Sequence, residues 1–120
     1  MNPPIFTIVA ADSGVTALLG TDPVRFFPFG QAPDAAEMPY AVWQTISGSP
    51  ENYLSGVPSI DGWLVQVDVY AKRGTTARTV AEALRDAIEL EAYITAWRGE
   101  SKEEDNIFRY SFDVEFLTER

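Results

Sequence analysis

Two stretches of the chain alternate strictly between apolar and other residues. Val65, Val67 and Val69 occupy every second position of residues 63–71. Residues 107–117 repeat the pattern with Phe108, Tyr110, Phe112, Val114 and Phe116. Because successive side chains of a strand point to opposite faces of a sheet, this alternation predicts two strands, each with one face in the core.

A helical pattern follows the first of these strands. After Gly74, apolar side chains recur at the spacing of one helix face, at Ala77, Val80, Ala81, Leu84 and Ile88. This stripe predicts an amphipathic helix that packs on the sheet. Arg78 with Glu82, and Arg85 with Glu89, stand four residues apart, and we expect both pairs to form on its polar side.

The N-terminal region also has helical spacing, over residues 3–19, with an interruption at Asp12-Ser13-Gly14 that predicts a new N-cap. We therefore expect two short helices or one kinked helix, ending at Gly20. Shorter apolar runs predict strands at residues 24–29, 40–46 and 92–98. Pro28 favours an edge position for the first strand.

The remaining segments are rich in turn residues and charges. Residues 30–38, 48–62 and 99–106 are predicted as loops, the last as the tip of a hairpin closed by 92–98 and 107–117. The order of elements predicts an α+β fold: a mainly antiparallel sheet of about four to five strands with helices packed on one face, a two-layer sandwich. The length of 120 residues predicts a single domain over residues 1–120.

Composition narrows the possible chemistry. The chain has no Cys and no His, which excludes disulfides, cysteine nucleophiles and histidine bases. Its net charge of −9 argues against binding by phosphate neutralisation, and we expect no direct sequence-specific nucleic-acid binding. The N-terminus lacks the basic start of a secretion signal, and no apolar run approaches bilayer length. We expect no membrane partner and synthesis in the cytoplasm.

Three clusters of charged residues could have a functional role, and each also has a simpler structural explanation. Asp113 and Glu115 lie about 7 Å apart on one strand face, a spacing that suits an acid/base pair or a cation. The polar face of an alternating strand explains them better. Residues 103–105 lack the ligand spacing of a calcium loop. Lys72 and Arg73, with Arg78, form a basic cluster beside Tyr70, which suits a phosphate backbone, an acidic partner or simply a solvated strand end. We assign no catalytic, cofactor-binding or metal-binding residue, and we expect no cofactor.

The aromatic residues point to an interface. Helices on one face leave the other face of the sheet open, and Trp43, Leu64 and Tyr70 are expected on or near that open face. Tyr93 and Trp97 share a parity in the next strand and are expected to join them. An aromatic patch of this size marks an interaction site, unless loops and the N-terminal helices cover it.

The order of motifs resembles a known family. Pro39, Tyr40, Gln44, Ile46 and Ser47 match one strand motif, and the run 65–71 (VQVDVYA) followed by a helix matches another. On these motifs the chain resembles the tail-completion, or tail-terminator, proteins of long-tailed bacteriophages. The resemblance covers nearly the whole chain.

The resemblance implies a virion structural protein without enzymatic activity. Family members look like subunits of a ring, commonly a homohexamer, that caps the tail tube, stops its polymerisation and joins it to the head connector. The implied partners are further copies of the chain, the tail tube protein and the connector protein, at the head-proximal end of the tail. Two alternatives stay open: a head-completion or connector adaptor, and a small carboxylate-based enzyme or ligand-binding domain using Asp68, Asp113 and Glu115.

We expect the assembly contacts at a defined set of residues. The segment 49–61 holds Tyr53, Leu54 and Val57 among turn residues, and we predict that it is mobile in the free subunit and ordered at a contact. The full set of expected interface residues is Trp43, Tyr53, Leu54, Val57, Trp63, Leu64, Tyr70, Lys72, Arg73, Tyr93 and Trp97.

Overall fold

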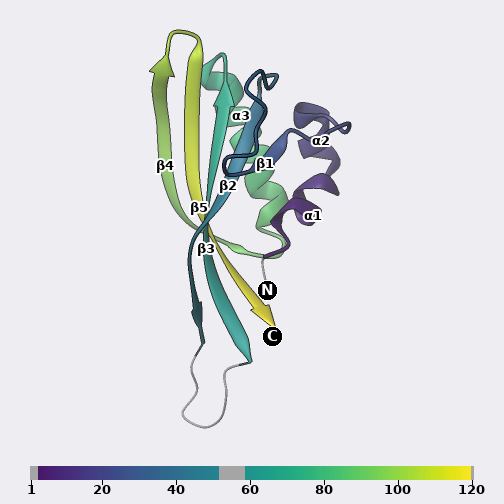
Figure 1. Ribbon diagram of the computed structural model, residues 1–120, viewed down its shortest axis with the longest axis vertical. Coiled ribbons are helices and arrows are strands. Elements are labelled where there is room, and N and C mark those ends of the chain that lie inside the picture. The colour runs from purple at the N-terminus through teal and green to yellow at the C-terminus, as the bar shows by residue number, and fades with distance from the viewer. Residues whose placement is uncertain (1–2, 52–58, 120) are drawn as a thin grey trace.

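The computed structural model describes residues 3–51 and 59–119 as an elongated body of 54 × 27 × 25 Å. Three helices lie on one face of a five-stranded sheet (Figure 1). The α+β, two-layer architecture predicted from the sequence is confirmed. The elements in chain order are α1 (Ile5–Ala10), α2 (Ser13–Leu19), β1 (Phe26–Pro28), β2 (Tyr40–Pro50), β3 (Ile60–Ala71), α3 (Gly74–Ile88), β4 (Tyr93–Glu104) and β5 (Ile107–Glu119).

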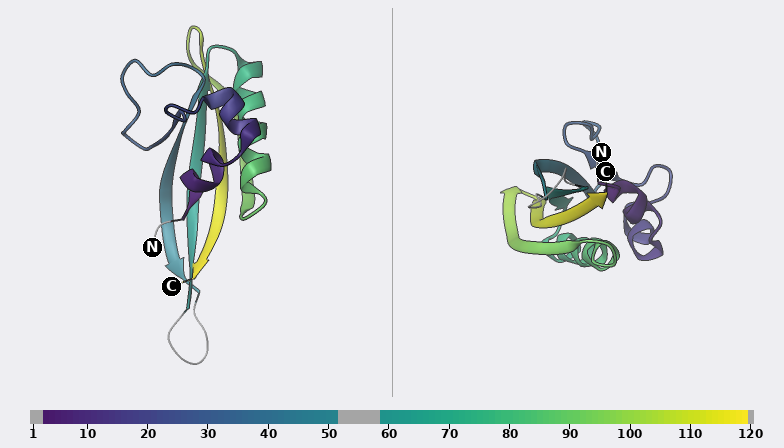
Figure 2. Two further views of the ribbon diagram at one scale, coloured as in Figure 1. Left: turned by 90° about the vertical axis from the view of Figure 1, so that its right-hand side faces the viewer. Right: turned by 90° about the horizontal axis from the view of Figure 1, so that it is seen from below.

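The strands are ordered β1-β2-β3-β5-β4 across the sheet. All neighbours are antiparallel except β1 and β2, which are parallel. The short β1 lies at one edge, as Pro28 predicted, and β4 forms the other. Helix α3 carries the chain across the sheet from β3 to β4, and β5 returns between them. The helices cover the same side of the sheet in every view (Figure 2).

The core lies between the sheet and α3. The three valines of β3 are fully buried, as are Phe112 and Val114 of β5. The predicted helix stripe, with Leu84 at its centre, is buried against them. Beside α3, on the same face of the sheet, α1 and α2 contribute Ile5, Val9, Val15 and Leu19. Each fully buried aliphatic side chain stabilises the fold by about 1.5–3 kcal/mol.

The predicted break between the two N-terminal helices is confirmed. Asp12 is the N-cap of α2, and its carboxylate accepts a hydrogen bond of 3.0 Å from the Val15 N–H. Gly20 ends the helix at φ 83°, a conformation that glycine adopts without a Cβ penalty. These two caps fix where the chain leaves the helical layer for the sheet.

The hairpin of β2 and β3 is longer than predicted. We expected the strands to end at residue 46 and to begin at residue 63, because Gly, Ser and Pro are frequent between them. The register instead continues through Ser47 opposite Leu64 to Pro50 opposite Asp61, after a β-bulge at Ile46. Cross-strand pairing therefore overrides the local turn propensity of this segment.

The hairpin of β4 and β5 is also longer than predicted. Most of the expected loop 99–106 is strand, since β4 runs to Glu104 and the turn is confined to residues 105–106. Asn106 has φ 65°, a left-handed conformation that Asn tolerates better than most residues. The charges of this segment belong to an edge strand that faces solvent on its free side.

The longer β4 also changes one predicted ion pair. Arg85 and Glu89 pair as expected, with 3.3 Å between Nε and Oε1. Arg78 does not pair with Glu82; its Nε donates to Glu100 Oε1 at 2.8 Å. Glu100 lies in the part of β4 that the sequence assigned to a loop, and its position beside α3 makes it the better partner.

One end of the sheet projects beyond the helices (Figure 1). We call this region the distal extension; it comprises residues 47–50 of β2, 60–64 of β3 and 115–119 of β5. Its three strands are in register: Ser49 of β2 and Leu117 of β5 both lie opposite Gly62 of β3. The rest of the sheet, with the helices, is the body.

Candidate functional site

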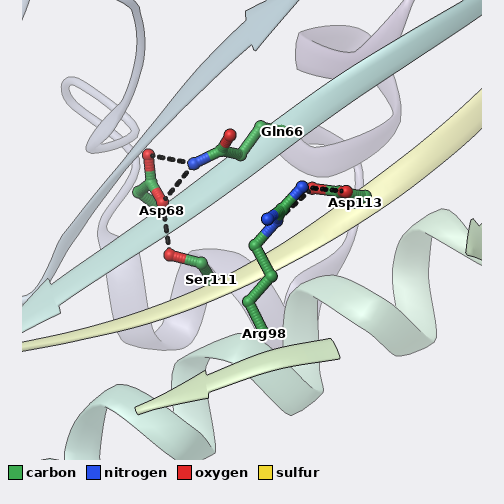
Figure 3. Close-up of polar contacts among 5 residues, drawn as sticks. All are labelled: Gln66, Asp68, Arg98, Ser111 and Asp113. Carbon is green, nitrogen blue, oxygen red and sulfur yellow. Dashed lines mark hydrogen bonds and ion pairs between the residues drawn. The ribbon is translucent and has the colours of Figure 1, made fainter. Parts of the chain in front are cut away.

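The centre of the sheet face opposite the helices is polar. Gln66 Nε2 donates to both oxygens of Asp68, at 3.1 and 3.3 Å, and the Ser111 hydroxyl donates to Asp68 Oδ1 (Figure 3). These side chains come from adjacent positions of β3 and β5, where Asp68 lies opposite Ser111. The Asp68 carboxylate therefore has neutral hydrogen-bond donors from two strands.

A second carboxylate on this face is held by an arginine. Arg98 of β4 binds Asp113 of β5 in a bidentate pair, with Nε–Oδ1 at 3.0 Å and Nη2–Oδ2 at 2.7 Å (Figure 3). The Asp113 side chain is 7% exposed, whereas that of Arg98 is 53% exposed. The hydrogen bonds and charge of Asp113 raise the pKa of Arg98. A register shift of β4 between Ile94 and Ala96 reverses the parity of the strand and thereby places Arg98 on this face.

This arrangement opposes an enzymatic site built from Asp68, Asp113 and Glu115. Both oxygens of Asp113 are occupied by Arg98, Asp68 is bound by its neighbours, and Glu115 is exposed. Within residues 3–51 and 59–119, no cluster of three acidic side chains is arranged to hold a metal ion. The face is built as a hydrogen-bonded structural network rather than as a pair of free carboxylates.

Aromatic residues cover the upper end of the same face. Tyr70 stacks on Tyr40 with ring centroids 5.2 Å apart, and Phe27 packs against Tyr40 at 6.3 Å. Burial and the nearby Asp68 raise the pKa of Tyr70, while Arg109 acts in the opposite direction. Tyr70 is thus on the open face, as the alternation of β3 predicted.

The assignment of Trp43 to the open face is wrong. Trp43 lies opposite Val67, so its side chain leaves the sheet on the buried, helix-covered side. There it stacks on Phe26 with ring centroids 6.4 Å apart. A single sequence does not determine which residues of β2 and β3 share a face, because the register of a hairpin depends on the pairing of its strands.

Trp97 also lies on the helix-covered side, so it does not share a face with Tyr93. Tyr93 pairs with Glu115 and Trp97 pairs with Phe112, because a β-bulge at Thr95 inserts one extra residue between them. Trp97 packs edge-on against Phe112 and Tyr110 and lies under the Arg85 guanidinium of α3. A single bulge thus reversed the parity predicted from the sequence.

The predicted aromatic patch is therefore replaced by a polar centre with apolar groups at both ends. The upper end carries the stacked pair Tyr40 and Tyr70. The lower end carries Leu64, Leu117 and Tyr93, all on the face that Glu115 shares. The participation of these residues in an interface stays a prediction.

Trp63 connects the strands of the distal extension on the helix-facing side. Its Nε1 donates to the Thr118 hydroxyl of β5 at 2.8 Å. On the other side its ring covers Gly48 of β2, where a Cβ would lie 2.8 Å from Cε3. Trp63 therefore spans all three strands, and Gly48 is required by this close approach.

The basic cluster predicted around Tyr70 is divided in the structure. Arg78 is neutralised by Glu100. Lys72 and Arg73 lie in the turn between β3 and α3, where both are exposed. Of the predicted cluster, only this pair remains open to an acidic partner.

Several exposed apolar residues were absent from the predicted interface. Leu117 is 48% exposed in β5 and Ile46, at the bulge of β2, is 43% exposed. Leu117 was detectable, because it shares the parity of Glu115 rather than that of Phe116. The others are Phe6, Phe29 and Leu90. Predicted contacts at Tyr53, Leu54 and Val57 lie outside the described residues.

The hollows on the surface are open, and they lie on both regions. One of about 300 Å³ on the distal extension is lined by Gly48, Ser49, Pro50, Asp61 and Trp63. Two others lie on the body. One of about 350 Å³ lies between α1 and the end of α3 and is lined by Ile8, Ala87 and Leu90, among others. Another of about 300 Å³ lies beside Arg25, whose guanidinium donates to the Leu18 and Pro39 carbonyls. Each helix in the described part of the chain is too short or too polar to cross a bilayer.

Comparison with known proteins identifies a family for this chain. The family model described as "Tail completion protein gp17" matches residues 3–119. Among solved structures, the chain is similar to one in the "Virion of native gene transfer agent (GTA) particle", with 13% identity and a TM-score of 0.71. The alignment covers 97% of this chain and 92% of that chain. At this identity the likeness shows a common fold. No curated protein matches the sequence.

Proposed function

We propose that this chain, which belongs to the tail completion protein gp17 family, is a tail terminator that assembles into a ring on the tail tube. Family membership itself makes it a phage tail completion protein, a structural and non-enzymatic component of the virion. The proposal adds the position and the action: the ring caps the tube, stops its polymerisation and joins it to the head connector.

The family match over residues 3–119 is the observation that carries this proposal. The positions of exposed apolar side chains support it. Exposed apolar side chains lie on the body, at Phe29 and Leu90, and on the distal extension, at Leu117. Contacts through different surfaces of one subunit are head-to-tail contacts, and these form a ring when the rotation between copies closes.

A phage or particle lacking this gene tests the position of the protein. Under our proposal, tails without the protein grow beyond their normal length or fail to join heads, and heads stay filled. A head-completion or connector role predicts leaking heads with tails of normal length. Complementation by the unaltered gene is the control, and leaking heads would overturn the terminator assignment.

A second experiment tests the activity of the purified protein. Its mass is measured alone and with tail tube protein, and the particles are viewed by negative-stain electron microscopy. We expect a ring with a central hole, and binding to tube ends. A protein that stays monomeric and never binds tubes would contradict the proposal.

A further inference from the structure

The two edges of the sheet differ in how they are protected against pairing with a further strand. The part of β2 beyond its pairing with β1, residues 44–50, contains no charged residue. Exposed strand edges normally carry charges or bulges, because unpaired N–H and C=O groups recruit other strands. The β2 edge does have a bulge at Ile46 and a proline at its end, Pro50, but residues 47–49 between them carry no charge that would oppose a further strand.

The opposite edge is protected. Strand β4 carries five charged residues among twelve and has three register irregularities, after Ile94, Trp97 and Lys102. Both features hinder the addition of a further strand. However, β4 begins opposite Glu115, so it leaves residues 116–119 of β5 without a neighbour on that side.

The direction of the backbone groups follows from the hydrogen-bond pattern. The Glu51 N–H donates to the Ile60 carbonyl, so Glu51 faces β3 and Ile60 faces β2. In an antiparallel ladder successive residues face opposite sides. Gly48 and Pro50 therefore present their carbonyls, and Gly48 its N–H, to the outside of β2.

The same alternation applies to β5. Since Ile60 faces β2, the next residue of β3 faces β5 and pairs with Thr118. Leu117 and Glu119 thus face away from β3, with their N–H and C=O groups on the free side. Within residues 3–51 and 59–119, β2 beyond Trp43 and β5 beyond Glu115 pair only with β3, so the outer sides of these two edges have no neighbouring strand.

We infer that the distal extension joins a second copy of this chain by strand pairing, with the β2 edge of one copy against the β5 edge of the next. The inference rests on the proposed function and specifies its subunit contact. Strands β2 and β5 are both antiparallel to β3 and so run in the same direction. Copies placed side by side in one orientation therefore meet in a parallel pair.

This contact is head-to-tail and repeats from copy to copy. Each subunit offers both edges at the same level, because Ser49 and Leu117 lie in one row through Gly62. The half-exposed side chain of Leu117 gains cover when the two edges meet. A rotation that closes the series forms a ring, as the proposed function requires.

Cysteine cross-linking tests the contact, and the absence of native Cys leaves no competing thiol. Ser49→Cys and Leu117→Cys are combined in one chain and the protein is oxidised. Within one copy the two positions are separated by β3, about 9–10 Å across two strand spacings, which is too far for a disulfide. Between paired copies they lie on adjacent strands, about 5 Å apart.

We expect the double variant to form a covalent ladder that ends at the native ring size, and each single variant to form none. The matched control combines Ser49→Cys with Ser101→Cys in β4 and should not cross-link. Multimers by native mass without a ladder would overturn this contact and leave the proposed function standing. A protein that is monomeric and does not cross-link would contradict both, and cross-linked single variants would replace this pairing with a symmetric one.

Discussion

The body and the distal extension are made from the same three strands but are stabilised differently. In the body, β3 and β5 bury Val67, Val69 and Phe112 under α3. The distal extension projects beyond the helices (Figure 1). There Phe116 is buried with the core, and Trp63 bridges the three strands. The body thus has a complete core, whereas the extension leaves Leu117 half-exposed and two strand edges unpaired.

The comparison shows that the same alternating pattern can stabilise the fold in one region and leave groups free for association in another. Where a helix stripe faces the alternation, apolar side chains provide folding free energy. Where no helix faces it, the same pattern leaves apolar groups and backbone donors for another chain. Substitutions in the two regions should therefore separate stability from assembly.

The largest expected effect comes from a matched pair of leucines. Leu84→Ala empties a fully buried position under the sheet and should destabilise the fold by about 2–5 kcal/mol. Leu117→Ala removes a half-exposed side chain and should change the free energy of unfolding by no more than about 1 kcal/mol. Urea unfolding measures both. Equal losses would show that the extension belongs to the folding core.

Gly48→Ala should disturb the extension without reaching the body. The new Cβ would meet the Trp63 ring at 2.8–2.9 Å, so the indole must move from the sheet. Overpacking of this kind costs about 1–3 kcal/mol. Near-UV circular dichroism reports the environment of the Trp63 indole, and urea unfolding measures the loss in free energy of unfolding. The neighbouring exposed Ser49→Ala is the control and should be silent; an unchanged Trp63 signal in Gly48→Ala would refute the close contact.

Arg98→Gln should leave Asp113 without its bidentate partner. A buried carboxylate deprived of such a donor costs about 1–3 kcal/mol, and the exposure of Arg98 favours the lower end. Lys102→Gln, which loses a solvent-exposed pair with Asp105, is the control and should cost less than about 0.5 kcal/mol. Adding Asp113→Asn to Arg98→Gln should recover part of the loss. If Arg98→Gln and Lys102→Gln lower the free energy of unfolding equally, the polar centre contributes nothing beyond a surface pair.

The smallest expected effect is a pH dependence at Tyr70. Burial raises its pKa in the folded protein, so the unfolded chain ionises first as pH rises. The stability that the neutral phenol supports is complete below about pH 10 and is lost as pH rises through the folded pKa. Tyr70→Phe should flatten the unfolding free energy between pH 9 and 12. An unchanged slope would argue against a half-buried phenol on this face.

The sequence predicted the elements with one face in the core, because their periodicity is set by burial. The valines of β3, the stripe around Leu84 and the cap at Asp12 are confirmed. Strand ends in Gly- and Ser-rich segments were missed, since their pairing depends on the partner strand rather than on local propensity.

The faces of the aromatic residues were harder to predict. A bulge at Thr95 moved Trp97 to the core side, and the register of β2 placed Trp43 there. Neither the bulge nor the register has a signal in a single sequence. The pair of Arg98 and Asp113 was missed for the same reason, because the bulge at Thr95 determines the face on which Arg98 lies.

Amide hydrogen exchange, residue by residue, tests the division between body and extension most directly. The rates are compared between dilute subunits and the assembled protein. Our account predicts that the outward amides of Gly48, Leu117 and Glu119 become protected on assembly, while those of α3 keep their rates. New protection confined to the helices, with the extension unchanged, would contradict it.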